Sequence, residues 1–338
     1  MPKSPNRPNL STTRLAELLQ APTQRAARGT PLRIAIIGDA MLDIYLLGDV
    51  ERISPEAPVP VVRVRERRSA LGGAANVAQN VTALGARCEL IAAVGDDGNG
   101  RQLREMLGAL GADPRGLVPA GRPTTTKTRV VARGQQVVRV DEEVDEDLDG
   151  DDIARLHEAV DRAVAEADAL ILEDYNKGVL VPSVIERAIA AAKSRGIPII
   201  VDPKYKNFFA FGGTTIFKPN RRELEAALGV EVDLDKPEAL PGVLKRLGAE
   251  YLLLTLSERG MALIEPSGTI HRIPAAAREV FDVVGAGDTV TAYLAGMLAS
   301  GATPVEAAII ANYAAGVEVG KAGAATVTPE EILAAHGS

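Results

Sequence analysis

The stretch Asp282-Val283-Val284-Gly285-Ala286-Gly287-Asp288-Thr289 decides the fold, because it runs directly into an apolar helical segment from Val290. A glycine-rich turn that opens a helix presents unpaired backbone N–H groups and the positive end of the helix dipole to an anion. The segment Gly285-Ala286-Gly287 is therefore predicted to hold a transferring phosphate. Asp288 would stand beside that phosphate and take a proton from an attacking hydroxyl. Taken alone, the pattern also fits a plain helix capped by Asp288 after a glycine turn.

The overall composition is typical of a folded globular protein. The chain has 338 residues, of which 46% are hydrophobic and 25% are charged. With 38 Lys and Arg against 45 Asp and Glu, the formal net charge is −7, which argues against non-specific binding to nucleic acid or to an anionic membrane. An anionic ligand must then be held locally. The single cysteine, Cys88, cannot form an intrachain disulfide, which is typical of a cytoplasmic protein.

From Leu32 onward, short β-rich runs alternate with helical ones. This alternation of strand and helix segments is typical of an α/β fold in which helices cover both faces of a mostly parallel sheet. Ligands of such sheets bind beyond the carboxyl ends of the strands. The predicted organisation is an N-terminal arm over 1–30 with one short amphipathic helix, a single domain over 31–330 and a C-terminal tail over 331–338.

Two polar β-rich segments, within 45–68 and 124–143, do not fit this alternation of strands and helices. The second contains the hairpin turn Arg133-Gly134-Gln135. Both are too polar on one face for a central strand. They predict a small sheet that projects from the body, acts as a lid and pairs with a second subunit in a homodimer. The acidic run over 141–152 predicts a solvated connection into a helix rather than a calcium loop, because the EF-hand spacing is missing.

A second glycine segment, Leu71-Gly72-Gly73-Ala74-Ala75-Asn76, leads into another predicted helix. Gly72 and Gly73 lack side chains, so a sugar can approach the backbone closely. Asn76 offers both a donor and an acceptor to sugar hydroxyls. The alternative is a tight strand-to-helix turn without a ligand.

The segments GGAANVAQNVTALGA (72–86) and DVVGAGD (282–288) together resemble the two motifs of the ribokinase-like sugar kinases, in that family's order. The resemblance covers roughly 32–328 and implies a three-layer fold and a kinase that uses ATP and Mg²⁺, with a monovalent cation in some cases. It assigns five residues to the nucleotide: Asn220, Glu223, Ser257, Gly260 and Asn312. Asn220 and Glu223 would also hold the metal through water. Otherwise Glu223 fits a helix-opening acid and Asn312 a surface amide.

The block from Gly38 to Val62, which ends in RISPEAPVPVV, resembles the D-glycero-β-D-manno-heptose 7-phosphate kinases. The segments DYNKG (174–178) and DPK (202–204) share that likeness and follow predicted strands. The resemblance implies that the γ-phosphoryl of ATP is transferred to O1 of heptose 7-phosphate, a step that supplies heptose for lipopolysaccharide cores. The sugar would be bound by Asp39, Asp43 and Asp174, and its phosphate by Lys177 or Lys204. Turn-capping aspartates and surface lysines are the alternatives.

Three other functions are weighed against this one. A kinase for another sugar phosphate, such as a ketohexose phosphate, is open because the glycine motifs do not identify the acceptor. A sugar-sensing protein with an inactive kinase fold is disfavoured by the presence of Asp288. An NAD-dependent oxidoreductase is disfavoured because no dinucleotide fingerprint follows the first strand. Many heptose kinases carry a C-terminal nucleotidyltransferase domain, whereas this sequence stops at Ser338, so we expect the kinase step alone.

Overall fold

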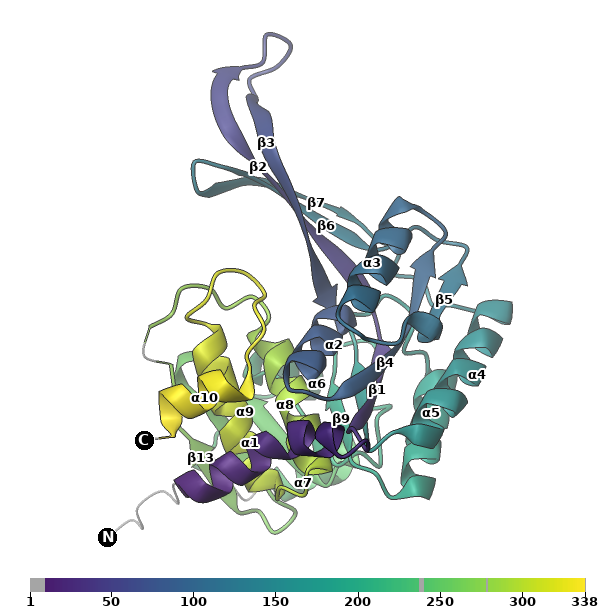
Figure 1. Ribbon diagram of the computed structural model, residues 1–338, viewed down its shortest axis with the longest axis vertical. Helices are drawn as coiled ribbons and strands as arrows, with labels where there is room; N and C mark the ends of the chain where they lie inside the picture. Colours follow the sequence, from purple (N-terminus) through teal and green to yellow (C-terminus); the bar gives the residue numbers. More distant parts are fainter. Residues whose placement is uncertain (1–9, 237–239, 278, 338) are drawn as a thin grey trace.

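The computed structural model describes residues 10–236, 240–277 and 279–337. In these residues a central sheet lies between two layers of helices, and a second, smaller sheet projects from the body (Figure 1). Alternate residues of the central strands face opposite layers: Ile34 and Ile36 pack against one, Ala35 and Ile37 against the other. The predicted three-layer α/β architecture is confirmed.

The central sheet has the strand order β13-β12-β11-β10-β9-β8-β1-β4-β5. The pairs between β5 and β11 are parallel, whereas β12 pairs antiparallel with both β11 and β13 at one edge. The parallel strands are short apolar runs because helices bury both of their faces. The strands are β1 (Arg33–Gly38), β4 (Arg87–Gly95), β5 (Leu117–Ala120), β8 (Ala169–Glu173), β9 (Ile199–Asp202), β10 (Ile216–Phe217), β11 (Tyr251–Thr255), β12 (Met261–Ile264) and β13 (Ile270–Ile273).

The helices form two layers, one on each face of the central sheet. One layer comprises α1 (Thr12–Ala27), α2 (Ala74–Ala83), α3 (Gly98–Ala109), α8 (Ala286–Ala299), α9 (Pro304–Glu318) and α10 (Pro329–His336). The other comprises α4 (Gly150–Glu166), α5 (Pro182–Arg195), α6 (Arg221–Leu228) and α7 (Leu240–Leu247). In α8 every residue from Asp288 to Met297 is buried, because the helix packs between α2, α9 and the ends of β8 and β9.

The projecting sheet has the order β3-β2-β6-β7 and stands out from the body in Figure 1. Its strands are β2 (Ala40–Ile53), β3 (Pro60–Gly73), β6 (Thr126–Ala132) and β7 (Gln135–Glu142). The predicted hairpin is confirmed: Arg133 and Gly134 join β6 to β7 with φ values of 52° and 77°, as a tight hairpin turn requires. The sheet begins earlier than predicted, because β2 follows β1 almost directly. Asp43 therefore lies on this sheet and not at the end of the first strand.

The first and last helices of the described chain, α1 and α10, pack against each other on one helical layer. The predicted N-terminal helix is α1, whose Leu15, Leu18 and Leu19 are buried. Residues 331–336 of the predicted tail belong to α10, because Thr328 and Glu331 close a capping box at the start of this helix. The acidic connection enters α4 at Gly150 as predicted. No helix among the described residues has the length and apolar character needed to cross a membrane.

Candidate active site

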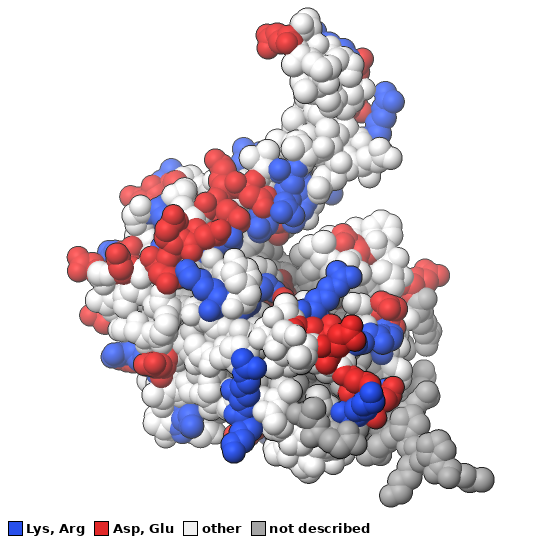
Figure 2. Space-filling model, turned by 180° about the vertical axis from the view of Figure 1, so that it is seen from behind, with Lys and Arg blue, Asp and Glu red and all other residues white. Residues whose placement is uncertain are grey.

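A cleft of about 370 Å³ lies beyond the carboxyl ends of β8 to β11. The body supplies Tyr175, Asp202, Lys218 and Thr255, each at or just after the end of one of these strands. The projecting sheet forms the opposite wall, and Figure 2 shows the hollow beneath that sheet. The cleft therefore lies where a parallel sheet is expected to bind its ligand.

Asp288 lies in the first turn of α8 at the floor of the cleft. Gly285, at φ 96°, is the residue that precedes the helix, so Asp288 does not cap it. The buried carboxylate accepts hydrogen bonds from Asn76 Nδ2 (2.6 Å) and Tyr175 Oη (2.9 Å). Burial raises the pKa of Asp288 to about 6, although both hydrogen bonds favour its charged form. Such a carboxylate is ionised at neutral pH and is more basic than an exposed one, which suits a general base.

The second glycine segment packs against the same floor. Gly73, at φ 56°, joins β3 to α2, and a Cβ there would lie 2.4 Å from the carbonyl oxygen of Asp39. A Cβ on Gly72 would lie 2.6 Å from Asp43 Oδ2. Both positions require glycine for packing, and both line the cleft together with Asn76. The segment from Gly72 to Asn76 therefore forms a tight strand-to-helix turn and also lines the cleft.

Asp39 and Asp174, predicted to bind the sugar, do not line the cleft. The Asp39 carboxylate accepts hydrogen bonds from the backbone N–H groups of Tyr175 (2.8 Å), Lys177 (3.0 Å) and Val179 (3.2 Å). Asp174 Oδ1 accepts one from the N–H of Asn176 (2.7 Å). Both carboxylates therefore shape the loop that carries Tyr175.

The two candidate phosphate-binding lysines lie in different places. Lys177 Nζ pairs with Glu143 (2.9 Å) and Asp145 on the acidic connection, and it does not line the cleft. Lys204 lines the cleft and pairs with Glu223 Oε1 at 2.5 Å. Burial lowers the pKa of Lys204, but its carboxylate neighbours raise it above the ordinary value, so the lysine is charged.

Three basic residues of the projecting sheet were missed by sequence analysis. Lys127, Arg129 and Arg139 line the cleft from β6 and β7. Arg129 and Arg139 stand directly opposite each other in the strand register, and the guanidinium of Arg139 pairs with Asp141 Oδ1 at 2.9 Å. The guanidinium of Arg129 also pairs with Asp43, the one predicted sugar-binding aspartate that does line the cleft. The two-residue spacing of Lys127 and Arg129 in the sequence places them on one face of a strand and was the available signal.

Asn220 and Glu223 lie together at the start of α6 and line the cleft. They form a capping box, with Asn220 Oδ1 accepting from the Glu223 N–H (2.9 Å) and Glu223 Oε2 accepting from the Asn220 N–H (2.8 Å). Asn220 and Glu223 therefore both cap the helix and line the cleft. Within the described ranges, no three His, Cys, Asp or Glu side chains are grouped as a metal site. An amide and one carboxylate at the cleft wall fit Mg²⁺ held through water and phosphate oxygens.

The remaining predicted nucleotide residues lie further along the same edge of the sheet. Gly260, at φ 85°, packs under β13, and a Cβ there would lie 2.1 Å from the Ile273 carbonyl oxygen. Ser257 is exposed in the turn between β11 and β12. Asn312 is buried, not on the surface, and donates a hydrogen bond to the Pro274 carbonyl oxygen (2.9 Å). Ser257, Gly260 and Asn312 do not line the cleft.

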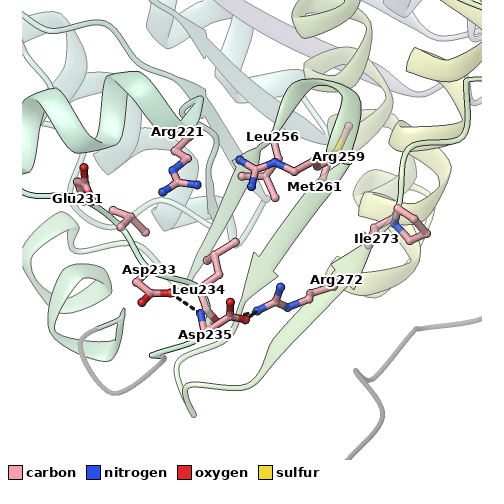
Figure 3. A pocket seen from close by; sticks show the side chains of 12 residues that line it. Arg221, Glu231, Asp233, Leu234, Asp235, Leu256, Arg259, Met261, Arg272 and Ile273 are labelled. Atoms are coloured by element: carbon pink, nitrogen blue, oxygen red, sulfur yellow. Dashed lines mark hydrogen bonds and ion pairs between the residues drawn. The ribbon is translucent and has the colours of Figure 1, made fainter.

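A second pocket of about 330 Å³ adjoins this turn (Figure 3). Arg221 and Arg259 extend into it from α6 and from the turn between β11 and β12. Arg272 is paired with Asp235 at its rim. Leu256 and Pro274 contribute apolar surface next to the residues predicted to bind the nucleotide.

The sequence as a whole matches the family model of the pfkB family carbohydrate kinases over residues 32–331. The chain belongs to the pfkB family of carbohydrate kinases. It is 46% identical over 301 residues to the bifunctional protein HldE of Pelobacter propionicus, covering 88% of this chain and 62% of that protein. It is likewise 46% identical over 306 residues to HldE of Gluconacetobacter diazotrophicus, covering 90% and 63%. The kinase thus spans less than two thirds of the length of these relatives.

Solved structures with the same fold include a putative ribokinase from Agrobacterium tumefaciens, with a TM-score of 0.71 at 23% identity, covering 90% of this kinase and 97% of that chain. The tetrameric inhibited form of phosphofructokinase-2 from Escherichia coli gives a TM-score of 0.74 at 21% identity, with the same coverage. The ribokinase-like fold is thereby confirmed. The family match confirms the prediction of an ATP-dependent carbohydrate kinase.

The hydrogen bond from Tyr175 to Asp288 yields a prediction on pH dependence. The phenol favours the ionised carboxylate, so Tyr175→Phe should raise the pKa of Asp288 above its value of about 6. A base must be deprotonated to act, and the acidic limb of the kcat/KM profile should therefore move to higher pH. Tyr205→Phe, at an exposed tyrosine, is the control. An acidic limb at the same pH in all three proteins would contradict a catalytic role for this contact.

Proposed function

We propose that this kinase transfers the γ-phosphoryl of ATP to O1 of D-glycero-β-D-manno-heptose 7-phosphate. The observation that carries the proposal is the pair Arg129 and Arg139, which face the cleft across from the proposed base Asp288. A phosphate on the acceptor would bridge the two guanidinium groups in place of their present carboxylate partners, Asp43 and Asp141. The resemblance of residues 38–62 to the heptose 7-phosphate kinases supports the choice of sugar.

The proposed reaction uses the two glycine segments in different ways. Asp288 takes the proton from the attacking hydroxyl of the sugar, whose ring would lie against Gly72 and Gly73. The N–H groups of the Gly285-Ala286-Gly287 turn stabilise the charge that develops on the transferred phosphoryl oxygens. Asn76 and Tyr175 hold the carboxylate of Asp288 in position for the proton transfer.

ATP would extend from this turn toward the residues at the edge of the sheet. Asn220 and Glu223 are the proposed contacts to the magnesium-bound water and the phosphates, and Lys204 is the cation beside them. When bound, Mg²⁺ would offset the charge of the phosphates. Ser257, Gly260 and Asn312 remain the proposed residues along the nucleotide. A ribokinase of this fold from Arabidopsis thaliana was solved in complex with ribose and ATP.

A monovalent cation fits next to the catalytic turn. Glu318 is fully buried in α9, and its carboxylate oxygens have no hydrogen-bond partner among the described residues. Burial and the charge of Asp282 raise the pKa of Glu318 to about 8. We propose that Asp282 and Glu318 hold this cation, as phosphofructokinase-2 from Escherichia coli was solved with potassium. Equal rates in potassium and tetramethylammonium chloride would contradict this.

The phosphate site on the projecting sheet can be tested with Arg139→Ala. Loss of a charged partner of a bound phosphate should lower kcat/KM for heptose 7-phosphate by roughly 10- to 150-fold. The loss should be much smaller with unphosphorylated heptose, which has no phosphate to hold. Arg67→Ala on β3 and Lys177→Ala are the two controls. Neither residue lines the cleft, so both variants keep every side chain that does. Coupled ADP release measures the rates.

If Arg139→Ala lowered kcat/KM equally for both sugars, Arg139 would be assigned to the ATP phosphates and the proposed phosphate site for the sugar would be wrong. Lys204→Ala should be examined in the same pair of assays, because Lys204 lies in the cleft and was a candidate for the sugar phosphate. Fructose 6-phosphate belongs in the panel as the ketohexose alternative. A higher kcat/KM for it than for heptose 7-phosphate would replace the proposed acceptor and leave the kinase assignment intact.

The outer face of the projecting sheet favours a homodimer. Arg139 faces the cleft, so the neighbouring Val138 and Val140 of β7 point to the other face. They are 47% and 50% exposed, and Ile53 and Val64 on the same sheet, with Val59 in the loop before β3, are also exposed. Apolar residues along exposed strands are a liability unless a partner covers them. We propose that a second copy does so.

Sedimentation should show a dimer for the unaltered kinase at micromolar concentration. Val138→Glu with Val140→Glu should shift the protein toward the monomer, because buried carboxylates would disfavour the interface. Val230→Glu, at an exposed valine on the body, is the matched control. A monomer in all three samples would contradict the pairing.

A further inference from the structure

A row of charged side chains lies at the carboxyl ends of three neighbouring strands, and two of them, Asp202 and Lys218, line the cleft. Glu173 ends β8 and Asp202 ends β9, and the two stand opposite each other in the parallel register. Lys218 follows β10 and lies beside Asp202, because Phe217 is in register with Val201. By the alternation of the strands, all three side chains face the layer that contains α8.

Lys218 is the cation of this row and is only 3% exposed. Its Nζ donates a hydrogen bond to Asp202 Oδ2 at 2.7 Å. An ammonium group has three N–H donors, and the described residues provide this one acceptor to it. Since Lys218 also lines the cleft, its remaining donors are available to a ligand there.

The position of Lys218 relative to the catalytic turn identifies that ligand. A Cβ built on Gly287 would lie 3.8 Å from Lys218 Nζ. Gly287 belongs to the turn that is proposed to receive the transferred phosphoryl group, and Asp288 follows it directly. The ammonium group therefore borders the same small volume as the turn and the base.

We propose that Lys218 is a further catalytic residue, whose ammonium group contacts the γ-phosphoryl of ATP and stabilises the charge on its oxygens during transfer. The proposal rests on the proposed function in taking the Gly285-Ala286-Gly287 turn as the place of transfer. It does not depend on which sugar is the acceptor. Asp202 acts through Lys218 and is a positioning residue.

The charges around Lys218 support a permanently charged ammonium group. Burial lowers the pKa of Lys218, but Asp202 and Glu173 raise it above the ordinary value. Glu173 is fully buried, with no hydrogen-bond partner for its carboxylate oxygens among the residues described. Burial, followed by the charges of Asp202 and Asp288, raises the pKa of Glu173. Asp202 is the hydrogen-bonded partner of Lys218, and Lys204 is a second cation nearby.

The test compares the unaltered kinase with Lys218→Met, which keeps the length of the side chain and removes its charge. We expect kcat to fall by about 10²- to 10³-fold, as when a group that stabilises transition-state charge is removed. ATP affinity should fall by roughly 10-fold or more, whereas ADP affinity should change by less than about 2-fold, because only ATP has the γ-phosphate. Lys245→Met, at an exposed lysine of α7, is the control. Equal losses for ATP and ADP, or an unchanged kcat, would overturn the proposal.

Rescue by added amines separates catalysis from a merely structural ion pair. Lys218→Ala opens space beside the cleft, and ethylammonium should restore part of kcat in a concentration-dependent way. Tetramethylammonium carries the same charge without an N–H donor and should not restore it. Equal effects of the two ions, or no effect of either, would contradict a direct contact with the phosphoryl group.

A variant that fails to fold is a foreseeable outcome, because removal of Lys218 leaves Asp202 buried without a partner. The double variant Lys218→Met with Asp202→Asn removes both charges, and it is compared with Asp202→Asn alone.

The acceptor is tested separately. If ATP binds but heptose 7-phosphate is not phosphorylated, the proposed acceptor fails, while the comparison of ATP with ADP still decides the role of Lys218.

Discussion

The buried carboxylate of Asp288 at the start of α8 is the interaction on which the rest of the site depends. It joins three segments that are distant in sequence: α8 itself, α2 through Asn76, and the loop after β8 through Tyr175. That loop is in turn held by Asp39, which accepts three of its backbone N–H groups. A carboxylate that is buried among fixed donors keeps one orientation and a raised pKa, and both properties serve a base.

The projecting sheet completes this site from the opposite side. Strand β2 continues almost directly from β1, and β3 ends at the glycine segment, so these two strands anchor the sheet at the floor of the cleft. Arg129 and Arg139 face each other on this sheet, and each pairs with a carboxylate, Asp43 or Asp141. A phosphorylated sugar bound as proposed would take the place of these carboxylates and hold the sheet against the body. Because the net charge is −7, binding of the proposed sugar phosphate together with ATP requires such a local concentration of basic residues.

Much of the fold could be predicted because the signals were local. The glycine turns before α2 and α8, the hairpin at Arg133-Gly134 and the alternation of strands and helices each follow from a few consecutive residues. The roles of Asp39 and Lys177 could not, because their partners are backbone groups or acids from other parts of the chain. Tyr175 and Lys218 were overlooked for the same reason. A tyrosine after a strand and a lysine before Pro219 gain meaning only when the sheet places them beside Asp288.

The most direct test of this account is the rate of phosphoryl transfer in a single turnover of Asp288→Asn. The substitution keeps the shape of the side chain. The amide oxygen can still accept from Asn76 and the amide NH2 can donate to Tyr175 Oη, but the proton acceptor is removed. The account predicts a transfer rate from ATP to heptose 7-phosphate that is about 10²- to 10⁴-fold lower than that of the unaltered kinase. The affinity for ATP, measured by calorimetry, should be nearly the same. A transfer rate within a few-fold of the unaltered kinase would show that Asp288 is not the base and would contradict the account.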